Sequence, residues 1–205
     1  GYTDVVVAIG AWAPGRKTLK SGEALDALEF LEEFKRAPES VDLGTDVVVI
    51  GAGNTAMDVA RAAKRVFGVQ NVRLVYRRTK RYMPADEEEL QMAIDDGVEF
   101  MELLAPGDLA NNQLTCEVMK LGAPDESGRR RPEGTGEFVT VPATAVITAV
   151  GEQIEPDLYA TSGIACDEKG LPVVDNNLQT SLAHVYAVGD GRRGPATVVK
   201  GIADA

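Results

Sequence analysis

The chain has 205 residues, of which 44% are hydrophobic, and its 21 basic and 32 acidic residues give a net charge of −11. This acidic balance argues against nucleic acid and anionic membranes as partners, and we expect neither. The two cysteines, Cys116 and Cys166, form no C-x-x-C pair, so we expect no disulfide framework and no metal or iron–sulfur site in this chain. The sequence contains no signal peptide and no membrane-spanning apolar run, which predicts a cytoplasmic protein.

The first expected elements are a strand and an amphipathic helix. Residues 3–9 are mostly aliphatic and predict a strand. Residues 23–35 predict a helix with one apolar face, because four large apolar residues recur there at a spacing of three, namely Leu25, Leu28, Leu31 and Phe34.

A glycine-rich turn follows the next strand. Residues 46–50 are mainly aliphatic, and the sequence then reads Gly51-Ala-Gly-Asn-Thr-Ala56 before a helical pattern over residues 54–67. This is the G-x-G-x-x-G/A pattern of dinucleotide-binding folds, in its strand–turn–helix context. Gly51 permits the tight turn, Gly53 lets the backbone approach a pyrophosphate, and Ala56 lets helix and strand pack closely. The phosphates would sit at the helix N-terminus, where free N–H groups favour an anion.

Two arginines close the second strand of this unit. Residues 72–76 predict that strand, and Arg77 and Arg78 follow it. An NAD site places an acidic residue here to hold the ribose 2′-hydroxyl, whereas two guanidinium groups suit a 2′-phosphate. The sequence therefore favours NADP(H) over NAD(H).

The remaining elements of the central region alternate in type. A second helix is expected from Met83-Pro84-Ala85 to about residue 95, and a third strand over residues 98–103. Residues 114–121 and 137–141 then predict a β-hairpin. Its tip carries arginines at positions 129, 130 and 131, which we interpret as part of a solvated turn, with docking to a partner or an anion as the alternative.

A short motif predicts how the chain is divided into domains. Strands ending in a small residue, an aliphatic residue and glycine occur at residues 7–10, 148–151 and 186–189. These copies bracket an α/β domain with a mainly parallel sheet, expected over residues 40–145. The flanks, 1–39 and 146–205, would belong to a second domain split by this insertion. Because the chain starts within a strand pattern and stops within a helix pattern, we expect it to be part of a larger protein.

Several motifs together resemble one family. They occur in the order Gly51-Ala-Gly-Asn-Thr-Ala-Met-Asp58, Tyr76-Arg-Arg78, Met83-Pro-Ala85, Asp125-Glu-Ser-Gly-Arg-Arg-Arg-Pro132, Val185-Tyr-Ala-Val-Gly-Asp190 and Gly194-Pro-Ala-Thr-Val-Val199. Over nearly its whole length the chain resembles the NADPH-dependent glutamate synthase small (beta) subunit. Relatives of that subunit include ferredoxin-NADP transhydrogenase/sulfide dehydrogenase subunits and the flavin half of dihydropyrimidine dehydrogenase. The resemblance implies a Rossmann-like NADPH domain inserted into remnants of an FAD domain.

The resemblance also implies which residues bind each cofactor. For the NADPH pyrophosphate they are Gly51, Ala52, Gly53, Asn54 and Thr55, and for the 2′-phosphate Arg77, Arg78 and Arg81. The residues implied on the FAD side are Gly151, the ribityl-binding pair Gly189 and Asp190, and the helix start Ala196, Thr197 and Val198.

The implied reaction is hydride transfer from NADPH to FAD, with electrons passing onward through iron–sulfur centres outside this chain. The cofactors carry that chemistry, so no catalytic residue and no metal ligand is predicted. The family's own FAD fingerprint and its iron–sulfur cysteines are absent from the sequence. We therefore expect the chain to be inactive alone and to need an N-terminal FAD and iron–sulfur region, with a large catalytic subunit as a further partner.

Single features of the sequence also resemble other functions. A short-chain dehydrogenase needs Tyr-x-x-x-Lys on a helix; Tyr76 and Lys80 have that spacing, but Tyr76 ends a strand. A methyltransferase would usually carry an acidic residue where Arg77 stands. A non-catalytic NADP(H)-binding module, and the same fold in a transhydrogenase or selenate reductase-like subunit, remain as alternatives.

Overall fold

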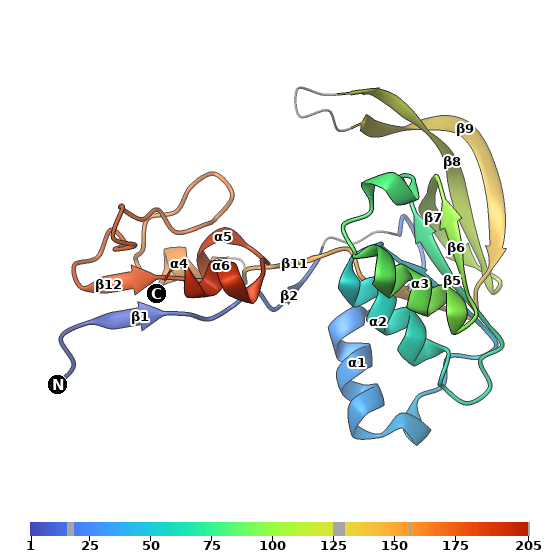
Figure 1. Cartoon of the computed structure of the whole chain (residues 1–205), viewed down its shortest axis with the longest axis horizontal. Coiled ribbons are helices and arrows are strands. Elements are labelled where there is room, and N and C mark those ends of the chain that lie inside the picture. The colour runs from blue at the N-terminus through green and yellow to red at the C-terminus, as the bar shows by residue number, and fades with distance from the viewer. Residues whose placement is uncertain (16–18, 125–129, 156, 205) are drawn as a thin grey trace. The chain divides into compact units, whose positions relative to one another are not determined.

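The computed structural model describes residues 1–15, 19–124, 130–155 and 157–204 (Figure 1). The chain divides into a larger unit, Arg16–Val150, and a smaller unit made of Gly1–Gly15 and Gly151–Ala205. The larger unit is longer than the range 40–145 that we predicted for the inserted domain. It is longer because strands and a helix outside that range belong to its sheet and core.

The centre of the larger unit is a five-stranded sheet in which every pair of neighbours is parallel. The strand order is β3-β10-β4-β5-β6, with bounds β3 Leu25–Asp26, β10 Ala145–Thr148, β4 Asp46–Ile50, β5 Asn71–Tyr76 and β6 Val98–Glu102. The valine, leucine and isoleucine residues of its central strands β4, β5 and β10 are buried, as aliphatic runs predict for a parallel sheet covered on both faces. The sequence prediction of an α/β Rossmann-like domain is confirmed.

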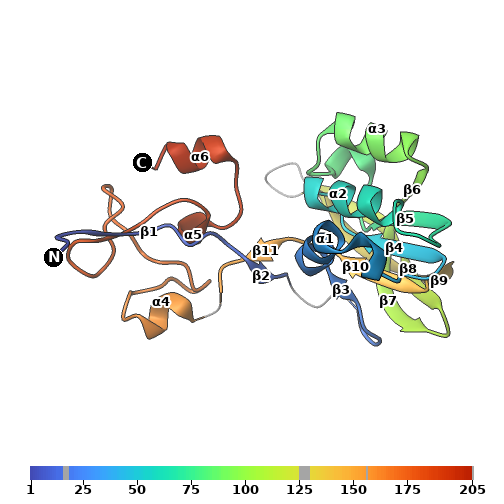
Figure 2. The same ribbon diagram turned by 90° about the horizontal axis from the view of Figure 1, so that it is seen from below.

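Helices cover one face of this sheet (Figures 1 and 2). They are α1 Ala27–Arg36, α2 Asn54–Ala63 and α3 Glu87–Asp95, with a short helix η1 Pro38–Ser40 after α1. Val47 and Val49 belong to the core on this side, together with Phe30 of α1 and Met57 of α2. Side chains alternate along a strand, so the intervening residues, Val48 among them, point to the opposite face.

All three of these helices are shorter than predicted, and α3 begins at Glu87 instead of Met83, after the N-cap residue Asp86. Helix α1 begins at Ala27 instead of residue 23, because β3 pairs with β10 and the Asp26 carboxylate then caps the helix, accepting from the Leu28 N–H at 2.9 Å. Helix α2 ends at Ala63 and residues 64–67 form turns before Gly68, whose φ is +89°.

An antiparallel sheet covers the opposite face (Figure 2). It is ordered β7-β8-β9, with bounds β7 Leu104–Ala110, β8 Gln113–Pro124 and β9 Arg130–Pro142. The predicted hairpin is therefore confirmed, although its strands extend further than expected. The segment 125–129, with the arginine at position 129, lies outside the described residues, while Arg130 and Arg131 lie in β9. Strand β7 was not predicted.

The smaller unit has little regular structure and its own core. Its strands pair as β1 Val5–Val7 with β12 Val185–Ala187 in parallel, and β2 Ala13–Pro14 with β11 Glu152–Gln153 in antiparallel. Its helices are α4 Leu158–Thr161, α5 Asp190–Arg193 and α6 Val198–Ile202. Tyr159, Ile164 and Ala187 form its buried core. The pairing of β1 with β12 joins the two segments of the chain that flank the larger unit.

Within the described ranges, no helix is long and apolar enough to cross a membrane.

Candidate cofactor-binding sites

The glycine-rich turn lies at the carboxyl end of β4. Gly51 has φ +144°, and a Cβ at this position would lie 2.3 Å from the Ala149 carbonyl oxygen at the end of β10. The Gly51 N–H donates to the Val75 carbonyl of β5 at 3.2 Å. Gly51 is therefore required by the close approach of three neighbouring strands, as the fingerprint predicts.

The turn presents a row of free N–H groups. Among the described residues, no acceptor bonds the backbone N–H groups of four consecutive residues, Ala52, Gly53, Asn54 and Thr55. A Cβ at Gly53 would meet only Pro84, at 4.0 Å, so the approach to this row is open. Helix α2 begins here without a side-chain cap. Free N–H groups at a helix N-terminus form an anion site, and the geometry fits a pyrophosphate.

The Asn54 side chain faces a neighbouring segment. Its Oδ1 accepts the Asp86 N–H at 3.1 Å, and its Nδ2 donates to the Asp86 carboxylate at 3.4 Å. The Ala85 N–H also donates to the Ala52 carbonyl at 3.1 Å. These contacts fix the glycine-rich turn to the start of α3, and they leave the backbone N–H of Asn54 as the group free for a ligand.

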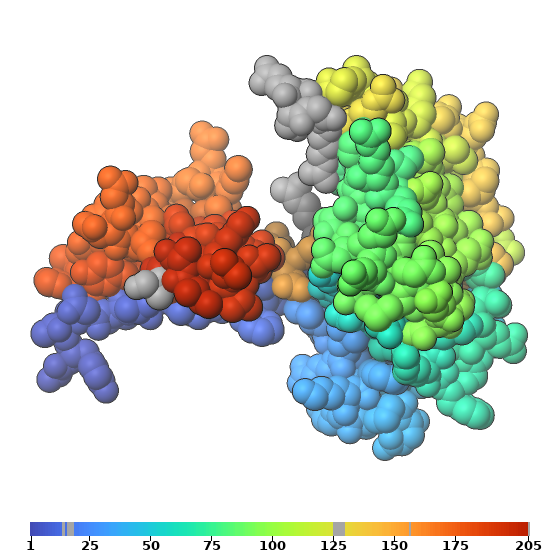
Figure 3. All heavy atoms as spheres, in the orientation of Figure 1, coloured from blue at the N-terminus to red at the C-terminus, as the bar shows by residue number. Residues whose placement is uncertain are grey.

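The predicted arginines follow β5 at the same edge of the sheet. Ile50 of β4 pairs with Val75 of β5, so Gly51 and the segment after Tyr76 leave adjacent parallel strands together. We name residues 77–83 the arginine loop; it contains a short helix, η2 Lys80–Tyr82. Figure 3 shows the segment between β5 and α3 on the surface of the larger unit.

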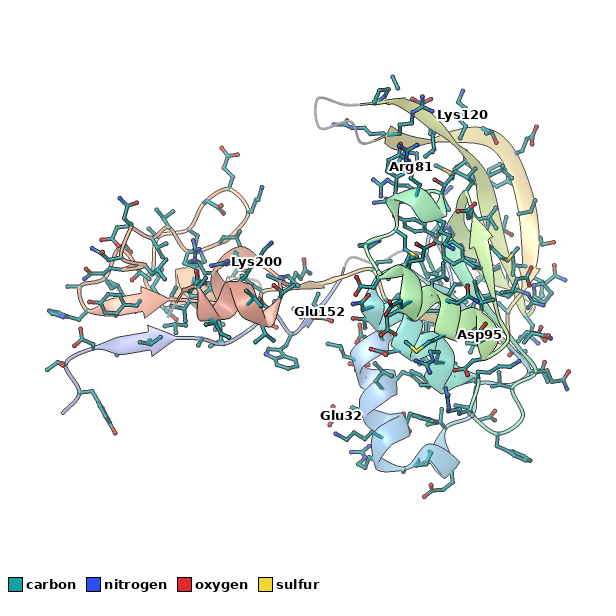
Figure 4. The ribbon with its side chains drawn as sticks, viewed as in Figure 1. Glu32, Arg81, Asp95, Lys120, Glu152 and Lys200 are labelled. Atoms are coloured by element: carbon teal, nitrogen blue, oxygen red, sulfur yellow. The ribbon has the colours of Figure 1, made fainter. Side chains whose placement is uncertain are left out.

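The arginines of this loop have no carboxylate partner in the described part of the chain. Arg77 and Arg81 are exposed, and Arg81 lies on η2 (Figure 4). Arg78 is half-buried, and its Nε is buried without a hydrogen-bond partner. A buried donor without a partner costs about 1–3 kcal/mol, which an anion bound at this guanidinium would recover. The loop is therefore suited to a phosphate dianion.

The Tyr-x-x-x-Lys spacing does not form a dehydrogenase pair. The Tyr76 side chain is nearly buried and its hydroxyl donates to the Tyr82 carbonyl at 2.7 Å. The Lys80 ammonium pairs with Glu87 at 3.3 Å. The Tyr76 hydroxyl therefore holds the arginine loop, and the Lys80 ammonium pairs this loop with helix α3.

A second candidate site is a hollow of about 460 Å³ in the smaller unit. Five of the residues implied on the FAD side line it, namely Gly189, Asp190, Ala196, Thr197 and Val198, and they are joined by Ala8, Gly10, Val188, Gly201 and Ile202. Gly189 has φ +64° and ψ −151°, a conformation that only glycine adopts readily. Gly151 is exposed and does not line this hollow.

A buried carboxylate supports the rim of the hollow. The Asp204 side chain is 6% exposed and accepts the Gly189 N–H at 2.8 Å. It also accepts hydrogen bonds from Arg192, at 3.3 Å, and from Arg193. The Nε atoms of both arginines are buried without a hydrogen-bond partner. The sequence reading missed Asp204, whose contacts depend on a turn that returns the chain to Gly189.

The whole chain matches a known family. The model of the family described as pyridine nucleotide-disulphide oxidoreductase matches residues 1–205. The chain belongs to this family. The resemblance to glutamate synthase small chains, inferred from the motifs, is also confirmed. The Halomonas elongata glutamate synthase [NADPH] small chain is 37% identical over 78% of this chain and 36% of its own length.

Other pyridine nucleotide-disulphide oxidoreductase relatives have different names. The Moorella thermoacetica NADP(+)-dependent formate dehydrogenase subunit beta is 36% identical over 98% of this chain and 30% of its own length. The protein YgfK of Escherichia coli (strain K12) is 47% identical over 87% of this chain and 17% of its own length. The chain therefore spans less than a fifth of YgfK and about a third of the other two relatives.

Solved structures of this type share the fold. FprA of Mycobacterium tuberculosis, in complex with NADPH, has a TM-score of 0.79 at 22% identity, over 99% of this chain and 61% of that chain. Lactococcus lactis thioredoxin reductase has a TM-score of 0.69 at 21% identity, over 98% of this chain and 62% of that chain. At these identities the likeness establishes the arrangement of the elements.

The cysteines of this family member form no redox pair. Cys116 and Cys166 are both free, and they lie in different units. Burial raises the pKa of the Cys116 thiol to about 11, which keeps it protonated and unreactive at neutral pH. No group of histidine, cysteine and acidic side chains in the described ranges could hold a metal ion.

Proposed function

We propose that the larger unit binds NADPH and that the smaller unit holds part of a flavin, so that the chain is the NADPH-binding portion of a flavin-dependent oxidoreductase. The observation that carries this proposal is the row of free N–H groups from Ala52 to Thr55 beside unpaired arginines at the same sheet edge. One nucleotide could engage both features, with its pyrophosphate at the row and its 2′-phosphate at the arginine loop.

Each residue of the NADPH site has a distinct role in the proposal. Gly53 leaves space for the pyrophosphate, and the backbone N–H groups of the turn donate to it. Arg77 and Arg78 receive the 2′-phosphate, and Arg81 is close enough in sequence to add a third positive charge. An NADH molecule lacks that phosphate and would leave the buried Nε of Arg78 without a partner. The proposed site therefore favours NADPH in two ways: the arginines attract the 2′-phosphate, and NADH leaves a buried donor of Arg78 without a partner.

The hollow in the smaller unit fits part of a flavin. The residues around it are small or apolar, and Gly189 and Asp190 supply a glycine turn and a carboxylate for a polyhydroxyl chain. The nicotinamide and flavin rings together supply hydride exchange, so the chain needs no acid–base residue for that step. This hollow favours a flavin-dependent oxidoreductase over a protein that only binds NADP(H).

Onward electron transfer is proposed from the relatives. We infer iron–sulfur centres and an N-terminal FAD and iron–sulfur region outside this chain, and a large catalytic subunit as a further partner. The named relatives include a glutamate synthase small chain and a formate dehydrogenase beta subunit, so the acceptor differs within the family. With one dinucleotide fingerprint, the 205-residue chain is expected to bind NADPH without turning over an acceptor.

The proposal is tested by titrating NADPH and NADH against the double variant Arg77→Ala plus Arg78→Ala. Each lost charged hydrogen bond costs about 1.5–3 kcal/mol, so the NADPH dissociation constant should rise at least about tenfold while that of NADH changes little. The matched control is Arg130→Ala plus Arg131→Ala, which removes the same charge from exposed positions in β9. An NADPH affinity that falls equally in both double variants would show a general charge effect and contradict the assigned site.

A further inference from the structure

The arginine loop is held in place by groups other than its own arginines. The Leu103 N–H donates to the Arg78 carbonyl at 3.2 Å, and the Tyr76 hydroxyl donates to the Tyr82 carbonyl at 2.7 Å. A third contact reaches the middle of the loop, where the Lys80 N–H donates to the Glu102 carboxylate. The loop is therefore fixed at both ends and at its centre.

Glu102 is placed for this contact by the sheet. It is the last residue of β6 and pairs in register with Tyr76, the last residue of β5. The side chain therefore lies at the carboxyl edge of the sheet, beside the point where the arginine loop begins. Its carboxylate forms no ion pair with the loop arginines in the described ranges, so their charges stay available.

We propose that Glu102 is a positioning residue that sets the preference for NADPH over NADH by holding the arginine loop in its phosphate-binding shape. This inference rests on the NADPH site proposed above and adds a residue to it. Ordering a residue's backbone costs conformational entropy, so a loop that is already ordered loses less freedom when the 2′-phosphate binds. NADH makes no contact with the loop arginines, so its affinity does not depend on this order.

The contact needs the reach of a five-atom side chain and an acceptor oxygen, and it does not need the negative charge. Glu102→Gln keeps the reach and an acceptor but removes the charge. Glu102→Asp keeps the charge but shortens the side chain by one methylene, and Glu102→Ala removes all three properties. Removing the charge beside a phosphate site does not weaken anion binding. The three variants therefore separate positioning from electrostatics.

The experiment measures dissociation constants of NADPH and NADH for the wild-type chain and each variant. Glu102→Ala and Glu102→Asp should weaken NADPH binding about five- to tenfold, the loss of roughly one hydrogen bond, while NADH binding stays within about twofold. Glu102→Gln should keep the wild-type preference. The control is Glu99→Ala, which removes a carboxylate from the other end of β6, where Glu99 pairs with Arg73. This control should leave the preference unchanged.

Each outcome decides a different claim. A wild-type chain with equal affinity for both nucleotides would overturn the proposed NADPH site itself. A selective wild type whose Glu102→Asp and Glu102→Ala variants keep full selectivity would overturn the role of Glu102 alone. Equal losses for NADPH and NADH would show that Glu102 supports the fold only, and would also overturn the inference. If Glu102→Ala does not fold, the comparison of Glu102→Asp with Glu102→Gln decides.

Discussion

A methyl group added at Gly51 would lie 2.3 Å from the Ala149 carbonyl oxygen, whereas one added at Gly53 would meet only Pro84 at 4.0 Å. The backbone also requires glycine only at the first position, because Gly51 has φ +144°, which other residues rarely adopt, whereas Gly53 has φ −91°. One glycine therefore serves the packing of three strands, and the other leaves space for a ligand.

The two alanine substitutions should separate these roles. Gly51→Ala is expected to destabilise the larger unit by roughly 1–3 kcal/mol, from backbone strain and overpacking. Gly53→Ala should leave the thermal midpoint near that of the wild type and weaken NADPH binding at least about tenfold, because its methyl group occupies the approach to the phosphate. Thermal unfolding and nucleotide titration of both variants measure the difference. A Gly53→Ala protein that binds NADPH normally would contradict the assigned approach.

Among the elements, the strands of the parallel sheet are tied together at their amino ends by Arg73. Its guanidinium, on β5, bonds Asp46 of β4 at 3.0 Å and Glu99 of β6 at 3.2 Å, and the Arg73 side chain is 16% exposed. The hydrogen bond from Arg73 is the main cause that lowers the pKa of Asp46 below its ordinary value. The Arg73–Asp46 pair is shielded from water and contributes more than an exposed pair does, whereas Glu99 is itself exposed.

This arrangement predicts a pH-dependent stability. A carboxyl group whose pKa is lower in the folded state stabilises the protein fully above its unfolded pKa of about 3.9, and this contribution is lost as the pH falls through the folded pKa. Arg73→Met should therefore lower the urea midpoint at pH 7, and the gap to the wild type should narrow below about pH 4. Urea unfolding followed by far-UV circular dichroism at pH 7 and pH 3 measures the difference in midpoint between the variant and the wild type. The control is Lys120→Met, which removes the exposed ion pair with Glu133. A difference between Arg73→Met and the wild type that does not change with pH would contradict this role of Arg73.

The sequence predicts the elements whose patterns are local. Strand β4, the glycine-rich turn, α2 and β5 follow from aliphatic runs and small residues at fixed spacing. Strand β3 does not, because its two residues lie within a leucine spacing typical of a helix and are extended only by pairing with β10. Strand β7 contains Pro106 and Gly107, both unfavourable in a strand, and it tolerates them at a register shift in its pairing with β8.

The same distinction applies to the sites. The glycines and arginines of the proposed NADPH site follow from spacing, because phosphate recognition needs those residue types next to each other in the chain. Asp86 and Glu102 have no such signal, since they reach the site through contacts of 32 and 22 residues in sequence separation. The contacts of Asp86 with the glycine-rich turn and of Glu102 with the arginine loop can be found only once the sheet edge is known.

On the scale of the whole molecule, the two candidate sites belong to different units. The larger unit has cores on both faces of its parallel sheet, and the smaller unit has a separate core around Tyr159. The proposed NADPH groups all lie in the larger unit, and the proposed flavin hollow lies in the smaller one. Binding of NADPH is therefore expected to protect one unit selectively.

Amide hydrogen exchange with and without NADPH tests the central claim most directly, because it reports on the N–H groups themselves. The amides of residues 52–55 have no acceptor in the described structure and should exchange quickly in the free chain. We predict that saturating NADPH slows their exchange and that of the arginine loop, while NADH protects residues 52–55 but not the loop, and residues 189–198 change with neither. Bound NADPH that leaves the exchange of residues 52–55 unchanged would contradict the account.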